Sequence, residues 1–148
     1  MSSSLRSLGF AVLLLGACAG TLNGQEPRQA PAPAPQVTNL AGARDRPGLF
    51  TQRLLLPANW CGAVHIHDHD LHGLVLRGIL RMGFADSAGR LDVREYPAGS
   101  FVAVPAGRVH VEGSVAQTEI HLSGIGPLVT TVVDSSKTPR CTPEQRGR

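Results

Sequence analysis

Long apolar runs are scarce in this chain of 148 residues. The N-terminal run, residues 8–15, covers about eight positions, far fewer than the roughly 20 that a bilayer-spanning helix needs. No later segment has the apolar pattern of an amphipathic helix, and aromatic residues make up only 4% of the chain. Neither a phosphate-binding glycine loop nor a G-x-S-x-G nucleophile turn is present. Lys and Arg are scattered although the net charge is +3, so no nucleic-acid partner is expected.

Glycine and proline are plentiful by contrast, with 17 and 11 residues. They separate short apolar runs at intervals of about 8–12 residues, which is typical of strands joined by turns. Residues 86–89 (DSAG) predict a hairpin turn, and Gly78 predicts a bulge or a corner. The sequence therefore predicts an all-β fold, an antiparallel sandwich or barrel. The expected strands are 50–56, 60–67, 72–80, 91–96, 101–104, 109–112, 118–122 and 128–133.

The N-terminal part has the composition of an export signal and a spacer. Residues 1–17 combine one arginine with an apolar core, and residues 15–18 (LGAC) resemble the lipobox of bacterial lipoproteins, in which Cys18 carries the lipid. A simple secretory signal cut near Ala17 or Ala19 is the alternative. The segment 18–46 is a predicted flexible linker rich in Pro and Ala, followed by a domain over 47–135 and a polar tail over 136–148. We expect the domain on the periplasmic side of a bacterial membrane, anchored through this lipid.

Four of the six histidines lie in residues 62–78, at His65, His67, His69 and His72. Residues two apart in a strand face the same side, so His65 and His67 are expected to project together. Two imidazoles on one face, joined by a third from another strand, make most of a site for a first-row metal.

The two histidine-bearing stretches resemble the two motifs of the cupin family. In the first motif, His65, His67 and Gly78 match, while Asn59 stands where the family has its opening glycine. The second motif, G-x5-P-x-G-x2-H, is complete over residues 99–110 and ends at His110. The flanking segments 53–57 and 124–127 are similar to those of small single-domain cupins. The resemblance implies a cupin-type jelly roll, also called a double-stranded β-helix, over about residues 47–134.

The first motif departs from the family at its metal-binding glutamate, because Leu71 occupies that position. The resemblance then implies a three-histidine site of His65, His67 and His110. A bulge or turn could add His72, His69 or Asp70 as a fourth ligand. Glu112 shares the parity of His110 and is a candidate general base or a partner of the ligands.

A histidine site of this kind suits Fe, Mn, Ni, Cu or Zn. The expected function is a metal-dependent, dioxygenase-like enzyme acting on a small anionic molecule. The alternative is a non-catalytic, membrane-tethered protein that binds or senses a ligand or a metal. Cupins often pair through edge strands, so the resemblance also implies a homodimer. The apolar wall of the pocket is expected to come from Leu71, Val75, Phe101 and Val104.

Cysteine usage is consistent with export. With Cys18 carrying lipid, Cys61 and Cys141 remain as an even pair in an oxidising compartment. A disulfide between them would fix the C-terminal tail beside the strand that bears His65 and His67. A Cys61 thiolate as a metal ligand is the alternative.

Overall fold

The computed structural model describes residues 33–134 and Cys141, which lie within one compact unit. The signal segment with Cys18, most of the linker and most of the polar tail lie outside these residues. Ten strands and no helix make up the described part of the chain, so it contains no helix able to span a membrane. The strands are β1 (Gln36–Ala41), β2 (Gly48–Leu56), β3 (Val64–His67), β4 (Leu71–Arg77), β5 (Ile79–Ala85), β6 (Leu91–Pro97), β7 (Phe101–Val104), β8 (His110–Ser114), β9 (Thr118–Gly126) and β10 (Thr130–Asp134).

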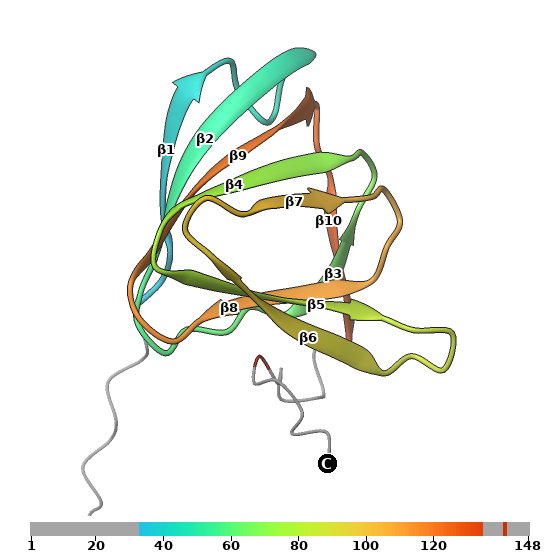
Figure 1. The fold of residues 1–148 in the computed structure, drawn as a ribbon. Helices are drawn as coiled ribbons and strands as arrows, with labels where there is room; N and C mark the ends of the chain where they lie inside the picture. The colour runs from blue at the N-terminus through green and yellow to red at the C-terminus, as the bar shows by residue number, and fades with distance from the viewer. Residues whose placement is uncertain (1–32, 135–140, 142–148) are drawn as a thin grey trace, which may run out of the picture. The chain divides into compact units, whose positions relative to one another are not determined.

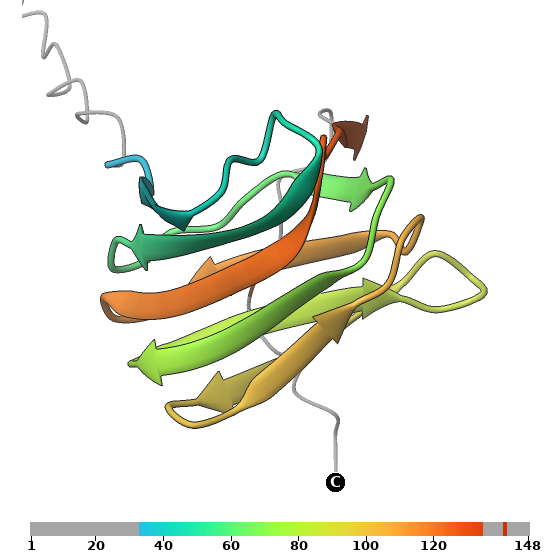
Figure 2. The ribbon, with the colours of Figure 1, turned by 90° about the horizontal axis from the view of Figure 1, so that it is seen from above.

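The strands form two antiparallel five-stranded sheets that face each other (Figures 1 and 2). One sheet has the order β1-β2-β9-β4-β7, and the other has the order β10-β3-β8-β5-β6. Neighbouring strands are mostly distant in the sequence, as in a jelly roll. The all-β expectation is therefore confirmed.

Gly78 is the corner at which the chain passes from one sheet to the other. The expected single strand 72–80 is in fact two, with β4 in one sheet and β5 in the other. Gly78 has a φ of +80°, and a Cβ there would lie 2.6 Å from both the backbone oxygen of Gln117 and the hydroxyl of Thr118. Only glycine fits this turn without displacing the backbone beside it.

Alternation along the strands builds the core between the sheets. In β4, Leu71, Gly73 and Val75 are buried, and the residues between them are exposed. Phe101 was expected in the wall of the pocket, but it is 62% exposed, and its neighbour Val102 is buried instead. Val104 of the same strand is buried as expected, and residues 101 and 104 lie on opposite faces of a strand, so the two could not both point inward. The main core consists of Phe50, Leu56, Leu71, Val75, Leu80, Met82, Val102, Val104, Ile120 and Leu128.

The folded part begins earlier than the sequence indicated. The strand β1 lies within the segment 18–46 that we predicted as linker, and it pairs with β2 from Gln36↔Leu55 to Ala41↔Thr51. All six of its residues are exposed. Because no residue of the strand is buried, its sequence has no pattern of apolar residues that would indicate a strand. Backbone pairing with β2 holds it at the edge of the sheet.

Cys61 and Cys141 are joined in a disulfide, as the cysteine count indicated, with their Cα atoms 5.7 Å apart. The bond closes a loop over a sequence separation of 80 residues. A loop of that size is worth about 4.5 kcal/mol in the chain-entropy account of cross-links. Because its sulfur is in the disulfide, Cys61 is not a thiolate ligand.

Candidate metal centre

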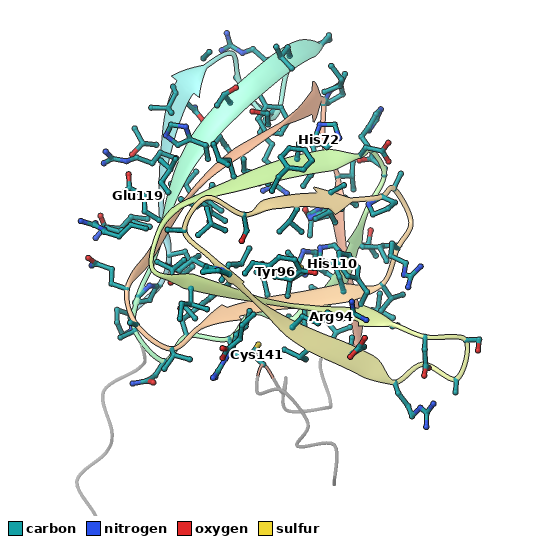
Figure 3. The ribbon with its side chains drawn as sticks, in the orientation of Figure 1. His72, Arg94, Tyr96, His110, Glu119 and Cys141 are labelled. Carbon is teal, nitrogen blue, oxygen red and sulfur yellow. A yellow bond between two sulfur atoms is a disulfide. The ribbon has the colours of Figure 1, made fainter. Side chains whose placement is uncertain are left out.

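Three histidines meet on the inner face of the β3–β8 pair. His65 and His67 both point inward from β3, and His110 begins β8 directly opposite His65. Their exposed fractions are only 8%, 7% and 2%, respectively. Figure 3 shows the side chain of His110 in the space between the two sheets. The structure thus brings together the three histidines that the motifs indicated.

The spacing of the rings suits one shared ion. Ring centroids lie 4.7 Å apart for His65 and His67, 4.3 Å for His65 and His110, and 5.1 Å for His67 and His110. The candidate ligand atoms all lie within 4.8 Å of one another. Imidazole nitrogens bound about 2.1 Å from one ion at about 90–110° lie about 3.0–3.4 Å apart. The Nε2 atoms of His65 and His67 are 3.2 Å apart, within that range.

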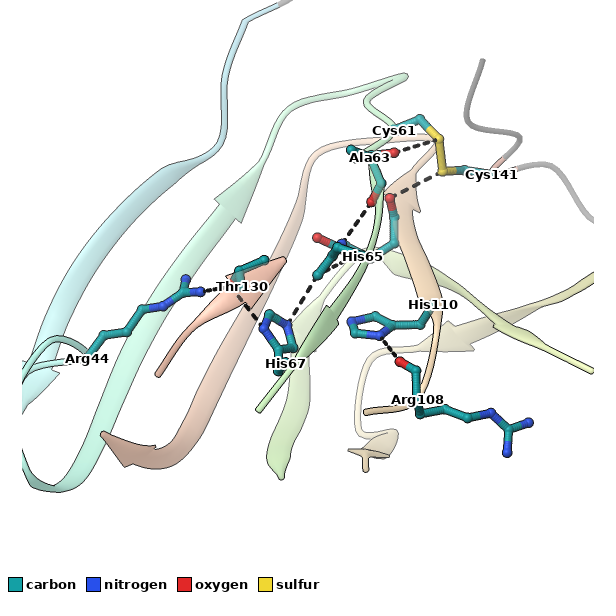
Figure 4. A network of polar contacts seen from close by, with 11 residues as sticks. Arg44, Cys61, Ala63, His65, His67, Arg108, His110, Thr130 and Cys141 are labelled. Carbon is teal, nitrogen blue, oxygen red and sulfur yellow. Dashed lines mark hydrogen bonds and ion pairs between the residues drawn. A yellow bond between two sulfur atoms is a disulfide. The ribbon is translucent and has the colours of Figure 1, made fainter. Parts of the chain in front are cut away.

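Each ring is held through its Nδ1 atom (Figure 4). The Nδ1 of His65 lies 2.8 Å from the carbonyl oxygen of Ala63, and that of His110 lies 2.8 Å from the carbonyl oxygen of Arg108. A carbonyl only accepts, so both Nδ1 atoms carry hydrogen, and Nε2 is the ring nitrogen that remains for a metal ion. Metal-binding histidines are oriented in this way by their second nitrogen. The two rings are therefore set to bind a cation through Nε2.

The third ring, His67, is held by a side chain. Its Nδ1 lies 2.9 Å from the hydroxyl of Thr130, which also accepts a hydrogen bond from the guanidinium of Arg44. Thr130 is directly opposite His67 in the β3–β10 pairing. Sequence reasoning missed both residues, because the register of distant strands cannot be read from a single sequence.

Burial keeps the centre in the form that binds metals. Desolvation, followed by the neighbouring histidines and Arg44, lowers the pKa of His67 to about 3. Desolvation is also the main cause that lowers the pKa of His110 to about 4. Both imidazoles are consequently neutral at physiological pH, as ligation requires.

The second motif forms a turn that is attached directly to β3. The amide of Gly107 donates a hydrogen bond of 2.7 Å to the carbonyl oxygen of His67. Gly107 has a φ of +69°, which glycine adopts at little cost. At the start of the first motif, Asn59 replaces glycine but keeps a left-handed φ of 55°. Asparagine is one of the few other residues that adopt this conformation.

The other candidate ligands lie outside the cluster. His69, Asp70 and His72 are all exposed. The carboxylate of Asp70 accepts a hydrogen bond of 2.7 Å from the amide of Ala106, and the His72 ring packs 5.5 Å from that of Phe101. Leu71 turns inward into the core, so strand alternation turns His72 to the outer face. None of the three completes the histidine site, and they instead line a pocket of about 560 Å³.

Glu112 lies beside the cluster. It follows His110 by two residues on β8, and its Oε2 lies 3.7 Å from the Nε2 of His65. That oxygen is buried and has no hydrogen-bond partner among the described residues. Burial raises the pKa of this carboxyl, against a smaller lowering by His65. The shared parity of residues 110 and 112 was the sequence signal for this position.

A smaller pocket of about 290 Å³ lies next to the centre. Its lining includes Phe84, whose ring centroid is 6.0 Å from that of His110. The guanidinium carbon of Arg108 lies 5.7 Å over the same Phe84 ring and also lines the pocket. None of the three histidines lines either of these two pockets, and Phe84 is the residue that both lines the smaller one and lies against His110.

Comparison with known proteins identifies the fold. Solved structures similar to this chain include oxalate oxidase in complex with the substrate analogue glycolate, with a TM-score of 0.54 and 21% identity. That match covers 67% of this chain and 55% of the oxidase, so the chain spans about half the oxidase's length. A cupin superfamily protein from Desulfitobacterium hafniense matches with a TM-score of 0.52 and 13% identity, over 62% of this chain and 77% of that one.

A conserved protein of unknown function from Streptococcus pyogenes is also similar, with a TM-score of 0.52 and 17% identity over 64% of this chain and 75% of that one. No curated protein matches the chain. Residues 24–131 match the family described as "Domain of unknown function (DUF4437)". The match covers well over half of the sequence and includes all three histidines. The chain therefore belongs to the DUF4437 family and has a cupin-like jelly-roll fold.

Proposed function

We propose that the domain binds a divalent first-row metal through His65, His67 and His110 and is an oxygenase-type enzyme acting on a small anionic substrate. The observation that carries this proposal is the orientation of the rings. Two rings donate from Nδ1 to backbone carbonyls, and the third is held at Nδ1 by Thr130. This arrangement leaves Nε2 of each ring for a ligand, as in histidine metal sites.

The residues around the centre would bind and orient the substrate. When bound, a metal of the Fe, Mn, Ni, Cu or Zn type would supply open positions for the substrate or for oxygen. Three neutral imidazoles do not offset the charge of a dication, and this favours an anionic substrate. The apolar side chains of Leu71, Val75 and Val104 lie in the buried core between the sheets and exclude water.

The smaller pocket supports the small size of the substrate. Its volume of about 290 Å³ is at the lower end for binding sites of small molecules. Arg108 supplies a positive charge at this pocket, and the pocket's two aspartates, Asp86 and Asp92, bind Arg90 and Arg94.

The second candidate function is a non-catalytic protein that binds a metal or a ligand. The observation that favours it is the burial of the three histidines, none of which lines the two pockets described above. A closed metal site would bind tightly and exchange no water, whereas an enzyme needs an exchangeable position. Relaxation of solvent water by the Mn(II)-loaded protein separates the two: a strong effect supports the enzyme, and its absence supports the binder.

The metal proposal itself is tested by metal content. The full chain, purified without a histidine tag, should contain close to one equivalent of a first-row metal by mass spectrometry. The double substitution His65→Ala/His110→Ala should lose it, and His69→Ala/His72→Ala is the matched control. A wild-type protein that takes up no metal, even after incubation with each candidate ion, would refute the proposal.

Export and lipid anchoring through Cys18 form the cellular part of the proposal. The disulfide supports an oxidising compartment, since such bonds are rare in the reducing cytosol. Cys18→Ala should release the protein from the membrane fraction. A homodimer remains a further proposal, which sedimentation of the purified protein can test.

A further inference from the structure

We propose that the carboxylate of Glu112 is the fourth protein ligand of this metal centre. The inference rests on the proposed three-histidine site and extends it. The first motif has a leucine where cupins have their metal-binding glutamate, so the anionic ligand would come from a different strand, two residues after the histidine of the second motif.

Strand geometry places the carboxylate on the correct side. His110 and Glu112 share one face of β8, as residues two apart do. They lie opposite Phe84 and Met82, respectively, in the neighbouring strand β5. The Oε2 of Glu112 is 3.7 Å from the Nε2 of His65, and that same Nε2 is 3.2 Å from the Nε2 of His67. Glu112 thus lies beside one of the three histidine ligand atoms, just outside the group that lies within 4.8 Å of one another.

The contact between Glu112 and His65 is not an ordinary hydrogen bond. The Nδ1 of His65 donates to the Ala63 carbonyl, so Nε2 is the ring nitrogen that faces the carboxylate. A distance of 3.7 Å is also too long for a hydrogen bond from a protonated carboxyl. A cation between these two atoms would bind the Nε2 of His65 and the Oε2 of Glu112 together.

The Oε2 of Glu112 is not engaged by any described residue in a hydrogen bond that would compete with metal binding. The atom is buried and unpartnered among the residues described, and an unpaired buried polar atom costs about 1–3 kcal/mol. A metal ion at the histidines would remove that cost. In contrast, the exposed acidic candidate Asp70 already caps the amide of Ala106.

The backbone around Glu112 is arranged for close approach. The amide of Gly62 donates a hydrogen bond of 2.9 Å to the carbonyl of Glu112. A Cβ on Gly62 would lie 3.2 Å from the Oε1 of Glu112 and 2.9 Å from the Trp60 ring. The absence of a side chain at Gly62 therefore leaves the space that the carboxylate occupies.

The test compares Glu112→Gln and Glu112→Ala with the control Glu119→Gln. Glutamine keeps the size of the side chain and removes the charge, so the fold should be retained, and circular dichroism and thermal melting of the metal-free proteins check this. Glu119 faces outward, where it pairs with Arg53 and Arg77 (Figure 3). The metal affinity is measured by chelator competition, and ligation is measured by the visible spectrum of the Co(II)-loaded full chain.

Removing a residue that hydrogen-bonds to a metal ligand typically weakens metal binding about 10–100-fold. Removing a direct ligand should therefore weaken it by an amount at the upper end of this range. We expect about 100-fold weaker binding and an altered Co(II) spectrum in both Glu112 variants, with wild-type values for Glu119→Gln. Unchanged affinity and spectrum in Glu112→Gln, together with metal loss in His65→Ala/His110→Ala, would overturn this inference and leave the three-histidine proposal standing. A wild-type chain that binds no metal would overturn both.

Discussion

Two pairs of histidines that are close in the sequence occupy opposite environments in the structure. His65 and His67 are buried in β3 with their Nδ1 atoms held by protein partners. His69 and His72 are exposed, one beside Asp68 and the other against Phe101. The residue type is the same, so the place of each residue in or beyond the strands and its burial decide which imidazoles can share an ion. A histidine-rich stretch is therefore not by itself a metal site.

The largest expected difference between the two pairs appears when each pair is replaced by alanine in turn. His65→Ala/His67→Ala should abolish metal binding, lowering the content from about one equivalent to near zero, because His110 is then the single histidine left at the centre. His69→Ala/His72→Ala should retain the full content. Mass spectrometry of the purified proteins measures both, and retention of metal by the inner double variant would contradict the comparison.

The same contrast applies to leucines on one strand. Leu71→Ala should lower the free energy of unfolding by about 3 kcal/mol, since it opens a cavity in the core. Leu74→Ala, on the outer face of the same strand, should cost less than about 1 kcal/mol. Urea unfolding monitored by circular dichroism gives both values. Equal losses in the two variants would show that β4 does not divide inside from outside as described.

Acid should destabilise the metal-free domain through the inner histidines. The pKa of His67 is about 3 and that of His110 about 4, against an ordinary 6.5, so the unfolded chain binds more protons between these values. Each histidine then makes the unfolding free energy fall by up to about 1.4 kcal/mol per pH unit as the pH drops below 6.5. Glu112, whose pKa is raised, acts in the opposite direction just above 4.5, because the native state keeps a proton that the unfolded chain releases.

The measurement is urea unfolding of chelator-treated protein between pH 4.5 and pH 7. His67→Gln should flatten the profile, and the outer control His72→Gln should leave it unchanged. A wild-type profile that is flat below pH 6.5 would contradict the burial argument.

The smallest expected effect concerns the support of one inner ring. Thr130→Val removes the hydroxyl that holds the Nδ1 of His67 and should weaken metal binding about tenfold. Thr131→Val, the next residue of β10, is the matched control, because it pairs with Ile66 rather than with a histidine. Equal affinities in the two variants, measured by chelator competition, would show that this anchor does not matter.

The sequence was sufficient for the fold class and for the three histidines, because alternation and motif spacing are local signals. The same signals correctly marked Gly78 as a turning point. They failed for β1, whose exposed residues carry no periodic burial, and for Phe101, where a four-residue strand gives parity little support.

The surroundings of the centre needed the structure. Arg44 and Thr130 reach His67 through pairing between distant strands, and such a register is invisible in one sequence. Glu112 had the correct parity, but the sequence could not show that its Oε2 lacks a partner. Burial and unmet hydrogen bonding are properties of the folded chain, so these roles could not be assigned earlier.

The disulfide has a topological consequence for this centre. The bond between Cys61 and Cys141 turns the intervening chain into a covalent ring that contains β3 to β10. All three histidines, Thr130 and Glu112 belong to that ring, while β1, β2 and Arg44 lie outside it. A single cut by a protease anywhere in the ring therefore leaves every proposed ligand in one covalently connected molecule.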